Sequence, residues 1–139
     1  MNRFLHLLSQ NKYIHAENPL AVKDVILAQK KMVKDGYPFL PEAFLNFLRL
    51  HNGVLANDSA LLGIAPLANK QLDIFKFNRE FNRNLSVVIL GYDDFCYLVY
   101  NKPLNCYQLV DKSGDMVLEE FADDELEYAL ISVLHVDAE

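Results

Sequence analysis

The chain has 139 residues, of which 52% are hydrophobic, 12% aromatic and 23% charged. These values are ordinary for a globular protein, so we expect one domain with a hydrophobic core, and intrinsic disorder is excluded. The net charge of −6 is unevenly distributed, with 11 basic and 7 acidic residues before position 91 and 2 and 12 from there on, which favours a charged partner.

The N-terminal third is predicted to be helical. Residues 1–17 are expected to form a short helical extension. The pair Asn18 and Pro19 gives a cap and first-turn signal for a longer helix. This helix is expected to run to about Lys34, because Gly36 then provides a stop signal.

Apolar spacing predicts which faces of these helices are buried. The longer helix is expected to bury one stripe and to expose its lysines. The stripe consists of Val22, Val25, Ile26, Met32 and Val33. A third helix over residues 41–51 is expected to bury Phe44, Phe47 and Leu48.

Strands dominate the remainder of the chain. Strands are predicted at residues 61–64, 86–92, 95–100, 106–111 and 116–118. A short helix is expected within residues 71–82, and a last helix over residues 123–136 closes the domain. This order of helices, strands and one closing helix indicates an α+β domain with a central, mainly antiparallel sheet, rather than alternating βαβ units.

Two of these strands are predicted to pair as a hairpin around Pro103. With the turn centred on that residue, Tyr97 is expected to face Leu109 and Val99 to face Tyr107. Both faces of the hairpin then carry large apolar side chains, so each face needs a cover. Helices are expected to cover one face, and the other is either a second core layer or a binding surface.

Six carboxylates of the acidic C-terminal part are candidate contacts for a basic protein. They are Asp93, Asp94, Glu119, Glu120, Asp123 and Asp124. A structural role is the alternative, since carboxylates favour helix N-termini and Asp124 with Glu127 has the spacing of a capping box. Because capping requires only one or two carboxylates, the others are available for recognition.

The sequence contains no motif for a metal, a cofactor or a catalytic residue set. The glycines are too dispersed for a phosphate-binding loop, and no histidine pair has zinc-hydrolase spacing. His51 paired with Asp93 or Asp94 is a candidate general base, which keeps a hydrolase as one alternative.

Several classes of partner are also disfavoured. The longest apolar run is residues 95–100, too short for a membrane-spanning helix. The lysines of the longer helix lack the aromatic and basic motif of nucleic-acid-binding proteins. Residues 4–8 lack the apolar length and the cleavage site of a secretory signal. We therefore expect a cytoplasmic protein without membrane or direct nucleic-acid partners.

Motifs of the third helix and the following strands occur in an order that resembles a known family. They are Leu40-Pro41-Glu42, Phe44, Phe47-Leu48, Asn52-Gly53, Leu62-Gly63-Ile64, Pro66-Leu67, Val88-Ile89, Gly91, Asp93, Asp94 and Tyr97-Leu98-Val99. The pattern resembles the SUKH superfamily over about residues 19–134. This superfamily includes Smi/Knr-type cell-wall assembly regulators and many bacterial immunity proteins.

The resemblance implies an α+β domain that binds proteins and has no general catalytic residue set. Bacterial members are often linked to the neutralisation of polymorphic toxins, frequently nucleases. We therefore expect residues 1–139 to form one non-enzymatic protein-binding domain, an immunity protein that covers the active surface of a cognate toxin. A regulatory scaffold of the Smi/Knr type, for envelope or signalling proteins, is the alternative.

Overall fold

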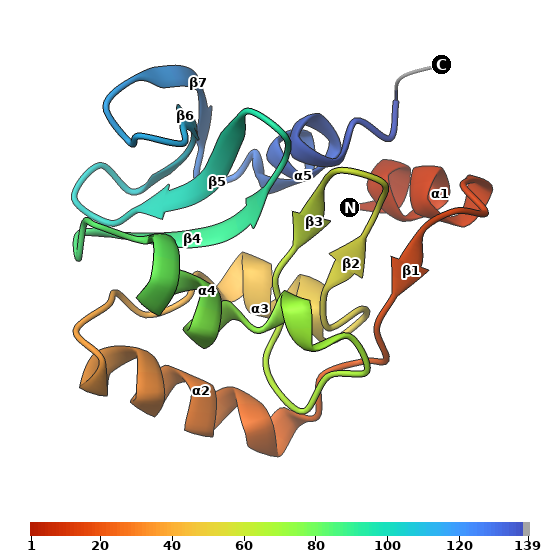
Figure 1. Cartoon of the computed structure of the whole chain (residues 1–139). Coiled ribbons are helices and arrows are strands. Elements are labelled where there is room, and N and C mark those ends of the chain that lie inside the picture. The colour runs from red at the N-terminus through yellow and green to blue at the C-terminus, as the bar shows by residue number, and fades with distance from the viewer. Residues whose placement is uncertain (138–139) are drawn as a thin grey trace.

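The chain folds around a seven-stranded antiparallel sheet whose strands follow one another in chain order (Figure 1). The structure, a computed structural model, describes residues 1–137, so the last two residues of the predicted domain lie outside the described residues. The strands are β1 (His15–Ala16), β2 (Val54–Leu55), β3 (Ala60–Leu61), β4 (Val87–Tyr92), β5 (Cys96–Asn101), β6 (Cys106–Asp111) and β7 (Val117–Ala122).

Helices lie on both sides of this sheet. They are α1 (Asn2–Gln10), α2 (Val22–Lys34), α3 (Glu42–Leu48), the short 3-10 helix η1 (Lys70–Leu72), α4 (Ile74–Phe81) and α5 (Leu126–Leu134). The α+β class is confirmed, with N-terminal helices, an antiparallel sheet and a closing C-terminal helix.

The helix α5 covers one face of the sheet, and α4 covers part of the other (Figure 1). The predicted apolar positions of α5 are all buried: Leu126, Ala129, Leu130, Val133 and Leu134. The helix α1 packs beside α5, and its fully buried Phe4 lies 5.4 Å from the ring of Phe47 on α3. The N-terminal extension thus contributes to the same core as the rest of the domain.

The prediction for α2 is wrong in two respects. The helix begins at Val22, because the N-cap Ala21 is extended and the preceding Leu20 N–H donates to the Leu48 carbonyl at 2.9 Å. Val22, Ile26 and Val33 are more than half exposed, whereas Ala28 and Met32 are buried. The helix lies at the border of the fold, away from β5–β7 (Figure 1), so only a narrow stripe of its surface meets the core.

The hairpin of β5 and β6 forms as predicted, but its register differs by one residue. Tyr97 pairs with Val110, and Val99 pairs with Gln108. The turn contains four residues, 102–105, and its centre lies between Pro103 and Leu104. Because side chains alternate between faces, this shift places Tyr107 and Leu109 on the α5 face and Gln108 and Val110 on the α4 face.

The fully buried Asn78 fixes α4 to the sheet. Its Nδ2 donates to the Ile89 carbonyl at 3.0 Å, and its Oδ1 accepts from the Ile89 N–H at 2.8 Å. The neighbouring strand β3 pairs only with Gly91 and Tyr92, so it does not reach this part of β4. The amide of Asn78 therefore makes the backbone hydrogen bonds that an additional stretch of strand would make.

We predict that Asn78→Ala lowers the free energy of unfolding by about 2 to 4 kcal/mol, because two backbone groups lose their buried partners. Urea denaturation followed by circular dichroism measures this change. The matched control is Asn46→Ala, at an exposed position of α3 whose side chain forms no hydrogen bond within residues 1–137. Equal urea midpoints for the two variants would contradict the proposed role of Asn78.

Candidate functional site

The structure separates the six predicted contact residues into two groups. Glu119 and Glu120 lie on β7, and Asp123 and Asp124 follow in the turn that leads into α5. We call these four residues the acidic edge. Cys106 at the start of β6 pairs with Ala122 beside this group.

Asp93 and Asp94 lie in the turn between β4 and β5, at the opposite end of the β5–β6 ladder. Ala122, next to Asp123, pairs with Cys106 at the far end of this ladder, so five strand steps of about 3.3 Å, or roughly 17 Å, separate Asp93 from Asp123. Glu119 lies closer to Asp93, because it pairs with Leu109 and its charge reaches the Cys96 thiol. One compact surface of all six carboxylates is therefore not formed.

Asp93 is buried, and its carboxylate forms hydrogen bonds within the fold. Its side chain is 8% exposed, and Oδ1 accepts hydrogen bonds from the N–H groups of Phe95 and Cys96, both at 2.8 Å. Its Oδ2 lies 2.9 Å from Nε2 of His135. Burial alone raises the pKa of Asp93, but the hydrogen bonds from Phe95, Cys96 and His135 outweigh it and lower the pKa overall. The carboxylate thus holds the β4–β5 turn and the end of α5 together.

The thiol of Cys96 completes this cluster without becoming reactive. Its Sγ lies 3.1 Å from Asp93 Oδ1 and donates to it. Burial, followed by the hydrogen bond and the negative charge of Asp93, raises the pKa of the thiol to about 12. A nucleophilic cysteine requires the thiolate form, which these surroundings disfavour. The grouping of cysteine, aspartate and histidine therefore serves packing and does not resemble an activated nucleophile.

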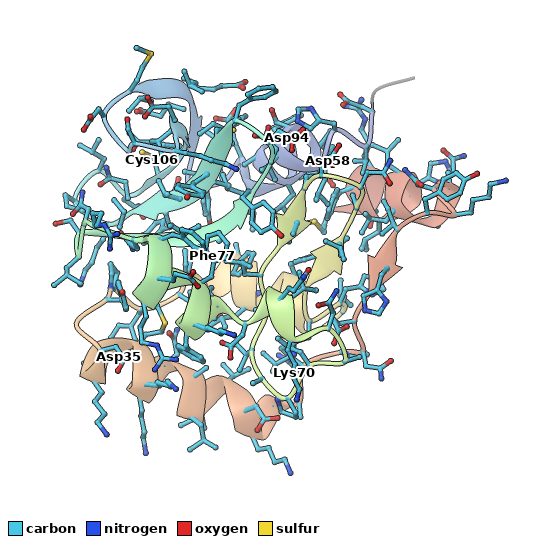
Figure 2. The ribbon with its side chains drawn as sticks, in the orientation of Figure 1. Asp35, Asp58, Lys70, Phe77, Asp94 and Cys106 are labelled. Carbon is cyan, nitrogen blue, oxygen red and sulfur yellow. The ribbon has the colours of Figure 1, made fainter. Side chains whose placement is uncertain are left out.

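Asp94 lies beside Asp58 and Phe95, which the sequence patterns did not indicate as site residues. Asp58, from the turn between β2 and β3, lies near it (Figure 2), and both line a small cavity of about 290 Å³. Phe95, which also lines this cavity, is 80% exposed. The pairing of β3 with β4 brings the two turns together. No local sequence signal links Asp58 with Asp94, because their proximity depends on that strand pairing.

The acidic edge lies on an edge strand of the sheet. The strand β7 pairs with β6 on one side only, and residues 117–120 are exposed. Met116, Val117 and Leu118 are each more than half exposed, so apolar side chains adjoin the carboxylates. An exposed apolar patch with polar neighbours is typical of protein interaction sites.

The predicted capping box at the start of α5 is absent. The N-cap is Glu125, whose Oε1 accepts from the Ala122 N–H at 2.8 Å. Glu127 instead lies 2.7 Å from the N-terminal ammonium of Met1 and accepts from the Phe4 N–H. Helix capping therefore does not account for Asp123 or Asp124.

The structure does not bring His51 next to Asp93. The ring of His51 lies 6.4 Å from that of Phe47, and its side chain has no hydrogen-bond partner within residues 1–137. The histidine that contacts Asp93 is His135. A general base at His51 would need an acidic partner from another molecule.

Metal and membrane features were also sought. Within residues 1–137, no three His, Cys, Asp or Glu side chains come together in a group that could hold a metal ion. None of the helices in this described part combines the length and the apolar character needed to cross a membrane.

A groove lies on the face of the sheet opposite α5. It has a volume of about 510 Å³ and is lined by β4, β5 and β6, the end of α4 and the turn before β7. Phe77 of α4 stacks on Tyr92 at 5.1 Å (Figure 2), so α4 covers one part of this face and the groove occupies another. The sequence left open whether this face is a second core layer or a binding surface. In the structure, the part under α4 belongs to the core, and the part at the groove is open surface.

We predict that Asp93→Asn lowers the free energy of unfolding at pH 7 by about 1 to 3 kcal/mol, because a buried charged acceptor is lost. The folded-state pKa of Asp93 lies below its ordinary value, so its stabilising contribution is present above about pH 4 and is lost as the pH falls through the folded pKa. Urea unfolding at pH 7 and pH 3 should thus show a difference from the wild type that narrows at pH 3.

The exposed neighbour Asp94 supplies the control for this experiment. Asp94→Asn should change stability by less than about 0.5 kcal/mol at either pH. A difference between Asp93→Asn and the wild type that stays constant from pH 7 to pH 3 would contradict the assigned role of the carboxylate.

Comparisons with known proteins were made for the whole chain. No protein-family model matches the sequence. No curated protein matches it at a significant level.

Proposed function

We propose that this chain is a non-enzymatic protein-binding domain that binds a basic protein through the acidic edge. The observation that carries the proposal is the position of four carboxylates and three exposed apolar side chains on and beside the edge strand β7. Apolar contacts supply affinity in such interfaces, and charge complementarity supplies orientation and a fast association rate.

The carboxylates of the acidic edge are available to a partner. Glu119 accepts from Ser132, Glu120 from Gln108 and Asp123 from Asn105, which orients the three side chains. No lysine or arginine within residues 1–137 lies within ion-pair distance of these side chains. Four unneutralised carboxylates, three of them oriented by hydrogen bonds, create a negative field that attracts a basic surface.

The resemblance to the SUKH superfamily supports a more specific proposal. On this proposal the chain is a cytoplasmic immunity protein, and its partner is a toxin with a basic active-site cleft, such as a nuclease. A nuclease must bind phosphates, so its cleft is positively charged and complements the acidic edge. Neutralisation then requires only that the bound domain blocks entry of nucleic acid to the cleft.

The test is co-expression with the protein encoded beside the gene for this chain. The wild-type chain should restore the growth of cells that express this toxin, and it should co-purify with the toxin. Failure of both rescue and complex formation would overturn the immunity proposal. Recovery of envelope or signalling enzymes in place of a toxin would replace it with the scaffold function.

A charge-neutral variant tests the surface separately. The combined substitutions are Glu119→Gln, Glu120→Gln, Asp123→Asn and Asp124→Asn, which keep an accepting oxygen at each position. We expect the Kd for the toxin to rise about tenfold or more, mainly through slower association, with a weaker dependence on salt. Surface plasmon resonance at two salt concentrations measures both effects.

A second variant with the same change of net charge is the control. It combines Glu42→Gln, Asp58→Asn, Glu80→Gln and Asp137→Asn, all at exposed positions outside the acidic edge. The control should bind the toxin with a Kd within about threefold of the wild type, since its interface is intact. If both variants weaken binding equally, net charge and not the acidic edge determines affinity.

A further inference from the structure

The groove opposite α5 has the dimensions of a small-molecule site. Its volume of about 510 Å³ falls within the range of roughly 300 to 1,000 Å³ that is common for such sites. The proposed protein-binding surface on β7 meets the groove at Val117, which belongs to both.

The apolar surface of the groove has a buried base and an exposed rim. Ile89, Val99 and Val110 lie on neighbouring strands, face the same side and form the buried base. The apolar side chains that remain open are those of Phe81, Leu104 and Val117, which are 43%, 62% and 51% exposed. Asn101 and Gln108 add one polar contact, since Asn101 Nδ2 donates to Gln108 Oε1 at 3.3 Å. An apolar chain laid along β5 would therefore meet a preformed surface.

Two cations, Arg83 and Lys112, line the groove, and Lys112 lies near Tyr97 at one end of it. Lys112 Nζ is 5.9 Å from the centre of the Tyr97 ring, and the charge of Arg83 partly offsets the rise in the pKa of the Tyr97 phenol that burial causes. Both cations line the groove, and neither forms an ion pair within residues 1–137. They are therefore free to bind an anion.

The charge of the lining contrasts with that of the chain. Asp115 is the one carboxylate among the lining residues, so Arg83 and Lys112 leave the lining at +1, whereas the whole chain carries −6. Leu104 and Asn101, at the far end of β5 from Tyr97, carry no charge, and the nearby Glu120 accepts a hydrogen bond from Nε2 of the lining residue Gln108 at 3.0 Å. The groove thus combines two unpaired cations with a lining that is partly apolar and partly polar.

We propose that this groove binds an amphipathic anion, an unbranched apolar chain that ends in a carboxylate. The carboxylate lies between Arg83 and Lys112, and the chain follows the base toward Leu104. From Tyr97 to Asn101 the strand advances four residues, or about 13 Å, which accommodates a chain of medium length. The groove shares Val117 with the proposed protein-binding surface, but binding of a small ligand requires no protein partner, so either proposal can fail without the other.

Three ligands that differ only in their head group test the proposal. They are decanoate, 1-decanol and decyltrimethylammonium, each titrated into the full chain by isothermal calorimetry below its aggregation concentration. Decanoate should bind at least tenfold more tightly than decanol, and the cationic ligand should bind most weakly. Equal affinities for decanoate and decanol, or no detectable binding of decanoate at millimolar concentration, would overturn the proposal.

Paired variants locate the head group. Arg83→Gln with Lys112→Gln should abolish the preference for decanoate over decanol, while the unfolding midpoint stays unchanged because both side chains are exposed. The control, Lys34→Gln with Arg49→Gln, removes two exposed cations elsewhere and should retain the preference. Loss of the preference in both variants would overturn the assignment to Arg83 and Lys112.

The position of the chain is measured by NMR. Addition of decanoate should shift the methyl signals of Val99 and Val110 and leave those of Leu130 on α5 in place. Shifts confined to residues outside the groove would overturn the proposed site even if decanoate binds.

Discussion

Three amide side chains each bind both backbone groups of one residue, and the arrangement of the fold depends on these contacts. Gln29 binds Leu40, Asn52 binds Ile64 and Asn78 binds Ile89, with donor–acceptor distances between 2.6 and 3.0 Å. In each case, no neighbouring strand is available to form hydrogen bonds with these backbone groups. A buried N–H or carbonyl without a partner is costly, so these amides allow short strands to lie inside a packed core.

The contact of Asn78 with Ile89 also determines where the open surface lies. It holds α4 against β4, and Phe77 then covers Tyr92. The helix is only eight residues long, so it cannot cover β5, β6 and β7 as well. The groove is the part of this face that α4 leaves open, whereas α5 covers the other face with six buried side chains.

The fold places the basic and acidic parts of the sequence on different elements. The first 90 residues carry a net +4 and the last 49 a net −10. The lysines of α2 lie on the exposed side of a helix at the border of the fold, and the acidic edge lies on β7. The sheet order places β7 at the end farthest from β1, so the edge strand that is free to meet a partner is also strongly negative.

Local patterns in the sequence were sufficient for the α+β class, the hairpin of β5 and β6 and the buried face of α5, because these follow from periodicities of 2 and 3.6 residues. Local patterns did not give the register of this hairpin. The turn has four residues and is not centred on Pro103, so Tyr107 and Leu109 lie on the α5 face. Val22, Ile26 and Val33 met the spacing of a buried stripe, yet the position of α2 left them exposed. Asp93 and Asp94 are adjacent in sequence, but packing against His135 and Cys96 buried only the first. Spacing therefore specified which faces are apolar, and only tertiary packing decided which of those faces were covered and which carboxylates stayed free.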